Sequence, residues 1–407
     1  MPEQNLSPTH RLWLAQHALN LLSFGRHCPQ AVGGSAWLDE VGAPRDSVAT
    51  ATWITCRMVH VYSIGALLGV PGATPVARQA LAGLSGRLHD TETGGWFHAI
   101  DGSGTPAEGK SCYDHAFVLL AASSALLAGL TGAAELLDDA QAVFLEKFWD
   151  EENGRCVDTW DTGFSVCDPY RGANANMHAV EAMLAVGSVT SDTRWIQRAV
   201  RICRFVAEQA LAHEWRIPEH YDESWRPVLE YNRDRPDDQF KPFGATVGHG
   251  LEWSRLFLHA EAALAPDENP WLLEGSIRLF DRAVEDGWFA DGLPGFVYTT
   301  DWTGDAVVRD RLHWVVAEAI NAAAALHRRT GQGEYLAQYL KYWDHAAEYF
   351  VDHEKGSWRH QLSSDNKPND TVWAGKPDLY HAFQAALGPR LPLWPMIAPA
   401  IATGRIE

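Results

Sequence analysis

Six short segments rich in glycine, tryptophan and aspartate recur along the chain at similar distances. They cover residues 33–42, 91–102, 150–161, 214–225, 285–302 and 353–362. One glycine or proline from each segment gives separations of 61, 59, 64, 69 and 69 residues, the markers being Gly34, Gly95, Gly154, Pro218, Gly287 and Gly356. A repeat of this length holds two helices and one turn-rich connection. The sequence therefore indicates six helical hairpins.

The stretches between these segments carry apolar residues at spacings of three and four, which is the periodicity of helices. This pattern predicts helices over 8–25, 50–69, 74–89, 112–129, 133–148, 174–188, 192–212, 247–265, 270–285, 310–330, 333–351 and 378–388. A hairpin cannot bury its apolar face alone, so neighbouring hairpins must stack. Six hairpins that close on themselves give an all-α (α/α)6 barrel, and an open solenoid is the alternative. No linker divides the chain, so we expect one catalytic domain over residues 1–407.

Composition limits the compartment and the partners. Apolar residues make up 46 % of the chain and the formal net charge is −19, which allows a large core but makes nucleic acid and anionic membranes poor partners. The chain shows no secretion signal and no run of about 18 apolar residues, and its six cysteines suit a reducing compartment. We therefore expect a cytoplasmic protein, either a monomer or a homodimer. The 18 tryptophans favour sugar binding, although core packing also uses this residue.

Histidines beside carboxylates at helix starts are the strongest candidates for chemistry. His249 lies between two glycines and precedes Glu252 by three residues, which places both side chains on one helix face. Glycine beside His249 would let a ligand approach the backbone closely. His178 precedes Glu181 by the same spacing, and Asn174 before it can cap the helix or bind sugar hydroxyls.

Two further helix starts near the carboxyl end carry similar side chains. Glu318 lies inside a stripe of alanine, valine and isoleucine, where a charge needs a partner, and His313 and Trp314 precede it. His381 falls in the first turn of a helix that Asp378 can cap. The positive end of that helix lowers the pKa of a histidine, which helps to keep His381 a neutral base.

The amino-terminal half adds supporting residues. Arg57 lies amid an apolar helix together with His60, and a buried guanidinium must reach a pocket or an acid. Tyr113 begins another helix, followed by Asp114 and His115. The two His-x-x-Glu pairs reverse the order that di-metal bundles use, so we expect no catalytic metal. The sequence has no P-loop, no GxGxxG after a convincing strand and no GxSxG elbow, so no nucleotide cofactor or serine nucleophile is indicated.

Six ordered segments together resemble the N-acylglucosamine 2-epimerase superfamily, and within it the aldose–ketose isomerases that act on mannose or sulfoquinovose. They read TWITCRMVHVY, KSCYDHAF, GANANMHAVEA, PFGATVGHGLEW, RLHWVVAEAI and GKPDLYHAFQA, and they run from about residue 50 to residue 388. The resemblance implies an (α/α)6 barrel, two acid/base histidines at His249 and His381, and no metal. It also implies pocket positions at Arg57, Tyr113, Asn174, His178, Glu252, Glu318 and Lys376. Lys241 stands where the sulfosugar branch has arginine, which favours a neutral hexose.

These observations predict an isomerase that interconverts D-mannose and D-fructose, and D-lyxose and D-xylulose as further substrates. We expect His249, supported by Glu252, to move the ring-opening proton and neutral His381 to take the proton from C2. Arg57 would then stabilise the enediol-like intermediate. A sugar 2-epimerase, a sulfoquinovose isomerase, a glycoside hydrolase that uses Glu252 and Glu318, and a non-catalytic sugar-binding module are the alternatives.

Overall fold

The computed structural model describes residues 6–264 and 269–407, and helices dominate it. The helices are α1 (Pro8–Gly25), α2 (Thr52–Leu67), α3 (Ala73–Leu84), α4 (Cys112–Leu127), α5 (Ala133–Val143), α6 (Ala173–Thr190), α7 (Thr193–Ala212), α8 (Val247–Ala263), α9 (Pro270–Gly287), α10 (His313–Thr330), α11 (Gly333–His345), α12 (Tyr380–Leu387) and α13 (Ile397–Ala402). All twelve predicted helices are present, with end points that differ by up to six residues, except that the end predicted at residue 265 lies outside the described residues. The short helix α13 was not predicted.

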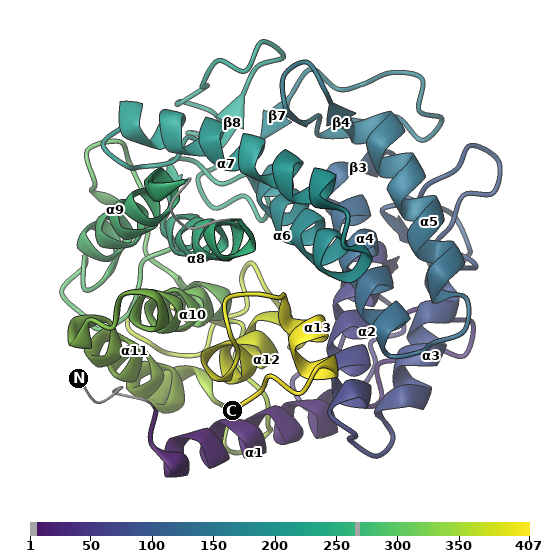
Figure 1. The fold of residues 1–407 in the computed structure, drawn as a ribbon, viewed down its shortest axis with the longest axis horizontal. Helices are drawn as coiled ribbons and strands as arrows, with labels where there is room; N and C mark the ends of the chain where they lie inside the picture. Colours follow the sequence, from purple (N-terminus) through teal and green to yellow (C-terminus); the bar gives the residue numbers. More distant parts are fainter. Residues whose placement is uncertain (1–5, 265–268) are drawn as a thin grey trace.

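The even-numbered helices α2 to α12 form a closed inner ring. Each packs against the next, and α12 packs against α2, which completes the circle. Figure 1 shows the outer helices lying around this ring, with α1 from the amino end beside α12 from the carboxyl end. The sixth hairpin is therefore built from the two ends of the chain. This arrangement confirms the (α/α)6 barrel and excludes the open solenoid.

Burial differs between the two rings in the way that helix position requires. Nearly every residue of α2 and α4 is buried, because these inner helices contact neighbours on all sides. The outer helices α7 and α9 bury one apolar stripe and expose the rest. No helix in the described part of the chain is both long enough and apolar enough to span a membrane.

The long connections lie at one end of the barrel and are joined by pairs of short antiparallel strands. The strands are β1 (Thr50–Ala51), β2 (Ala99–Ile100), β3 (Lys110–Ser111), β4 (Trp149–Asp150), β5 (Arg155–Cys156), β6 (Thr159–Trp160), β7 (Arg171–Gly172), β8 (His220–Tyr221), β9 (Ala245–Thr246), β10 (Thr299–Thr300), β11 (Ala306–Val308), β12 (Arg311–Leu312) and β13 (Gln361–Leu362). The strand just before an inner helix pairs with the next connection five times, as β1–β2, β3–β6, β7–β8, β9–β10 and β12–β13. At the sixth position the backbone N–H of Lys376 donates to Leu38.

One turn recurs in all six connections. A side-chain oxygen accepts a hydrogen bond from the backbone N–H four residues later, at Asp39, Asp101, Asp161, Asp222, Asp301 and Ser363. Asp, Asn and Ser favour such turns because their short side chains bond the local backbone. The six similar segments of the sequence therefore form six turns with the same hydrogen bond. Because these connections share one end of the barrel, the first turns of the inner helices converge there.

Candidate active site

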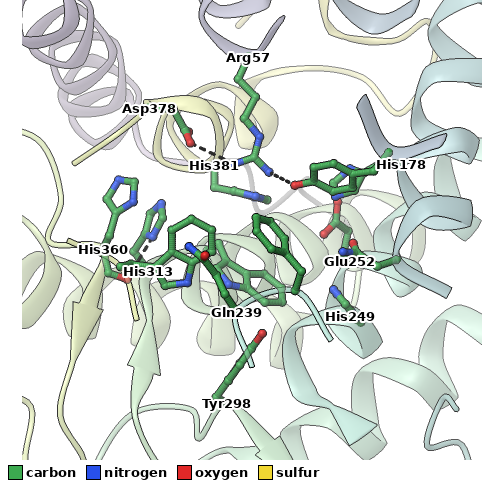
Figure 2. Close-up of a pocket in the computed structure, with 15 residues that line it drawn as sticks. Arg57, His178, Gln239, His249, Glu252, Tyr298, His313, His360, Asp378 and His381 are labelled. Carbon is green, nitrogen blue, oxygen red and sulfur yellow. Dashed lines mark hydrogen bonds and ion pairs between the residues drawn. The ribbon is translucent and has the colours of Figure 1, made fainter. Parts of the chain in front are cut away.

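A pit of about 600 Å³ opens at the end of the barrel that carries the long connections (Figure 2). Nine of the eleven residues predicted from the sequence line it, and each lies in the first turns of an inner helix. They are Arg57, Tyr113, Asn174, His178, His249, Glu252, His313, Trp314 and His381. Residues that are far apart in the sequence thus meet in one cavity, as the sequence predicted for His249 and His381.

The indole of Trp314 lies between these two histidines. Its ring centroid is 5.3 Å from that of His249 and 5.9 Å from that of His381. Gly248 makes this arrangement possible, because a Cβ atom there would lie only 2.3 Å from Cζ3 of Trp314. Glycine beside His249 was expected to let a ligand approach the backbone. The structure shows instead that it admits the tryptophan.

His249 is oriented by a carboxylate that the sequence analysis did not identify. Its Nδ1 lies 2.9 Å from both carboxylate oxygens of Glu219, which is buried at the start of the β8 segment. Glu252, the partner expected from the helical spacing, lines the pit but makes no hydrogen bond to His249 among the described residues. Since Nδ1 faces Glu219, Nε2 is the nitrogen left for a ligand in the pit.

His381 is paired in the same way with Glu318. Its Nδ1 lies 3.0 Å from Oε1 of Glu318, and Oε2 of that carboxylate accepts a bond of 2.8 Å from Nε of Arg255. Glu318 is fully buried and does not line the pit, so it acts on the site through His381 and not on a ligand directly. Its predicted need for a partner is confirmed, whereas the predicted contact with substrate is not.

Burial disfavours the charged form of four histidines that line the pit, namely His178, His313, His360 and His381. The pKa of His381 lies well below 6.5, first because burial disfavours the charged ring and then because Arg57 is near. The helix start was the expected cause, and burial is the larger one. Burial likewise lowers the pKa of His178 to about 4 and that of His360 to about 3. Neutral imidazoles of this kind can accept a proton.

Two carboxyl groups under the pit have opposite pKa shifts. Burial, reinforced by Glu318, raises the pKa of Glu252 well above its usual range. Burial acts on Glu181 too, but His178, Arg255 and Tyr380 outweigh it and lower the pKa of that carboxyl. The charged form is therefore disfavoured at Glu252, which faces the pit, and favoured at Glu181, which lies beneath it.

Arg57 is held rigidly in the wall. Its guanidinium donates to Asp378 and to the hydroxyl of Tyr113, both over 3.0 Å, and stacks on the rings of Trp53, Phe117 and Tyr380 at 4.8 to 4.9 Å. Asp378 also accepts the backbone N–H of Tyr380, the first residue of α12, but the N-cap position is Leu379, so Asp378 does not cap the helix as the sequence predicted. The charge of Arg57 thus faces the cavity from a fixed position (Figure 2).

A second pair of histidines lines the wall beside His381. The rings of His313 and His360 stack with centroids 3.7 Å apart. Nε2 of His313 is buried and has no hydrogen-bond partner among the described groups, although it belongs to a residue that lines the cavity. This atom is therefore suited to bind a sugar hydroxyl.

His178, Glu181 and Glu252 are the group best placed to hold a metal ion. One ligand atom from each lies within 4.8 Å of the others. However, Glu181 already accepts bonds from Tyr380 and Gln384, and the guanidinium of Arg255 lies 3.7 Å from Glu181 and 3.4 Å from Glu252. A cation would have to displace this guanidinium, so these residues fit a metal poorly.

Lys376 corrects one prediction made from the resemblance. Its ammonium group is fully buried and bonds the backbone oxygens of Glu40 and Gly356 and the carboxylate of Asp352. Three acceptors use all three of its N–H groups, and it does not line the pit. It joins two of the connections, and the structure does not place it in the lining of the pit as the resemblance implied.

Several other side chains flagged from the sequence are structural. His60 bonds Ser124, and His115 bonds the backbone of Ser111 and Trp96. Of the 18 tryptophans, Trp314 and Trp373 are the ones in the described lining of the pit. The other lining residues absent from the sequence prediction are Gln239, Phe240, Tyr298, His360 and Asp378, of which Asp378 had been read only as a helix cap.

Comparison with known proteins identifies the family to which the chain belongs. The family model described as N-acylglucosamine 2-epimerase (GlcNAc 2-epimerase) matches residues 33–385. The chain is 50 % identical to a D-mannose isomerase of Thermobifida fusca over 97 % of both chains. It is 44 % identical to a D-mannose isomerase of Pseudomonas cannabina pv. alisalensis, over 97 % of this chain and 96 % of the relative. A crystal structure of a D-mannose isomerase superposes with a TM-score of 0.87 at 26 % identity, covering 94 % of this chain and 98 % of that one.

Proposed function

Because the chain belongs to the N-acylglucosamine 2-epimerase family, we propose that it is an aldose–ketose isomerase that interconverts D-mannose and D-fructose. One observation carries the proposal. Two buried imidazoles lie against the same indole in one pit, and each has its Nδ1 bound to a buried glutamate. This leaves two Nε2 atoms to move protons on one sugar.

The reaction begins with the ring-closed sugar. His249, held by Glu219, passes the proton from the O1 hydroxyl to the ring oxygen, which opens the ring and frees the aldehyde. Neutral His381 then takes the proton from C2, and the electron pair of that C–H bond forms the C1–C2 double bond of an enediolate. A proton passes from O2 to O1, and His381 returns its proton to C1. The product is the ketose, and no atom or electron is gained or lost.

The wall of the pit stabilises the charge that develops on the sugar oxygens. Arg57 supplies a fixed positive charge, and the protonated carboxyl of Glu252 can donate a hydrogen bond. These groups are held in place before the reaction begins, so little reorganisation is needed when the charge forms. Nε2 of His313 and the side chain of Asn174 remain to bind the other hydroxyls.

A neutral hexose suits this pit better than a sulfonated sugar. Arg57 is the one Lys or Arg among the described lining residues, and Asp378 already neutralises it. Lys241 lies outside the lining, with its ammonium 3.8 Å from the centre of the Tyr170 ring. Glycoside hydrolysis is disfavoured for another reason. Glu252 and Glu318 share one guanidinium, so they cannot flank a glycosidic bond.

The test is incubation of the protein with D-mannose after treatment with a chelator, followed by identification of the product. Fructose should form. In deuterated water it should carry deuterium at C1, in the fraction of turnovers in which the proton on His381 exchanges with solvent before it is returned. Formation of glucose alone would identify a 2-epimerase and overturn the proposal. D-lyxose and sulfoquinovose, assayed in parallel, define the substrate range.

We also propose that residues 1–407 act as one catalytic domain, because the sixth hairpin needs both ends of the chain. The proposal includes a cytoplasmic location and a monomer or homodimer that needs no cofactor. Light scattering of the purified protein measures the oligomeric state.

A further inference from the structure

Arg255 lies one layer beneath the pit and contacts three buried carboxyl groups with three different nitrogens. Nε donates to Glu318 over 2.8 Å, Nη2 lies 3.4 Å from Glu252, and Nη1 lies 3.7 Å from Glu181. These carboxylates belong to α10, α8 and α6, so one guanidinium joins three inner helices. Arg255 itself is not among the residues that line the pit.

Each of the three carboxyl groups either lines the pit or contacts a histidine that lines it. Glu318 accepts from Nδ1 of His381, and Glu181 lies 3.7 Å from Nδ1 of His178. Glu252 lines the cavity directly. A change at Arg255 is therefore transmitted to several pit residues at once, although Arg255 contacts no ligand.

We propose that Arg255 is the positioning residue that keeps Glu318 an ionised acceptor and thereby fixes His381 with its proton on Nδ1. This inference rests on the proposed isomerase function, because it assigns His381 a free Nε2 as the base. The tautomer of an imidazole is set by the hydrogen bond that its other nitrogen makes. A neutral Glu318 would accept more weakly and could itself donate to Nδ1, which would leave the imidazole proton on the nitrogen that faces the substrate.

Among the charged groups around Glu318 and His381, Arg255 is the one that bonds the carboxyl group of Glu318. Burial raises the pKa of Glu318, and Arg255 is the largest influence acting against that rise. Other titratable or charged groups near His381 are Arg57 on α2, His178 and Glu181 on α6, His313 on α10, and Asp378 and Tyr380 beside it in the chain. Among these, Arg57 faces Asp378 and does not bond Glu318. Arg255 thus provides the guanidinium bond that Glu318 receives.

The experiment compares R255M and R255K with R329M. Arg329 is a matched control, because it also joins α8 to α10 through a two-point ion pair, with Glu261, but away from the pit. Rates are measured from pH 5 to pH 9 for mannose and fructose. The tautomer of His381 is read from nitrogen chemical shifts in protein labelled at histidine, with H381Q used to assign the signal.

R255M should lower kcat at least tenfold, change KM by less than threefold, and shift the His381 signal away from the Nδ1–H form. R255K keeps the charge but loses the fork, so it should lie between R255M and the unchanged protein. R329M should keep the kcat and the His381 signal of the unchanged protein. If R255M does not fold, R255K gives the same comparison.

Unaltered kcat and an unaltered His381 signal in folded R255M or R255K would overturn the inference. An equal loss in R329M would also overturn it, because the effect would then come from helix packing in general. Failure of the isomerase proposal is seen separately. In that case the unchanged protein does not convert mannose, while the tautomer measurement still tests whether Arg255 controls His381.

Discussion

The two glycines beside His249 offer a test of whether the position of Trp314 matters for turnover. Both lie in α8, but their surroundings differ. At Gly248 a Cβ atom would lie 2.3 and 2.6 Å from Trp314 and 2.9 Å from Val315. At Gly250 the nearest atom would be Cβ of Ala283, at 3.1 Å. Carbon atoms normally pack about 3.5–4 Å apart, so Gly248→Ala must push the indole back by more than about 1 Å.

The expected magnitudes follow from these distances. Replacing helical glycine by alanine gains about 1 kcal/mol, whereas overpacking costs about 1–3 kcal/mol. Gly248→Ala should therefore destabilise the protein by only about 0–2 kcal/mol. Its effect on turnover should be larger, because a misplacement of about 1 Å in an active site can cost about 100-fold. Gly250→Ala should change stability by less than about 1 kcal/mol and activity by less than about twofold, since Ala283 can yield a few tenths of an ångström.

The assay is kcat and KM for mannose together with urea unfolding of each variant. A large loss of kcat in Gly248→Ala with nearly normal stability supports a catalytic need for the Trp314 wall. Activity within threefold of normal in Gly248→Ala would refute the reasoning. Equal losses in both variants would show that the helix around His249 is sensitive, and not the indole.

Three further predictions concern ionisable side chains. Glu219→Gln should lower kcat about 10- to 100-fold, because a charged hydrogen bond is worth about 1.5–3 kcal/mol. Glu223→Gln, at an exposed position in the same connection, is the control. A normal kcat in Glu219→Gln would remove Glu219 from the mechanism. Arg57→Met should lower the free energy of unfolding, measured with urea, by about 3–5 kcal/mol, because Asp378 is left buried and unpaired. Adding Asp378→Asn should restore stability but not activity. A failure to restore stability would contradict the pairing argument. The free energy of unfolding should fall as the pH drops from about 6.5 towards 4. In this range the histidines of the unfolded chain bind protons, whereas folded His178, with a pKa of about 4, does not. Urea midpoints that do not decline from pH 7.5 to pH 6 and pH 5 would contradict this.

The fold and the first layer of the site could be predicted because local patterns encode them. The recurring turns mark the connections, and the spacing of apolar residues marks the helices between them. His249 and His381 stand out because polar side chains at the start of an otherwise apolar inner helix need a reason to be there. Their meeting in one pit follows once six hairpins close into a ring.

The second layer could not be predicted because it depends on contacts between distant elements. Glu219 lies in a turn-rich connection that resembles the other five, and its contact with His249 spans 30 residues. Arg255 looks like an ordinary member of a helical charge pattern until α10 places Glu318 beside it. Lys376 shows the opposite error, since it lies in a segment that matches the family but is used to join two connections.

The depth of a residue along an inner helix determines whether it can contact a ligand or only positions other residues. In α8 the residues His249, Glu252 and Arg255 follow one another at a spacing of three, so each lies about 4.5 Å deeper than the last. The first can reach a ligand, the second borders the cavity, and the third is sealed beneath it. Buried ion networks of this kind are often no more stable than apolar residues of the same volume. Stability alone therefore gives no reason for Arg255 to be buried among three acidic side chains, whereas a need to fix the proton on His381 accounts for its bond to Glu318.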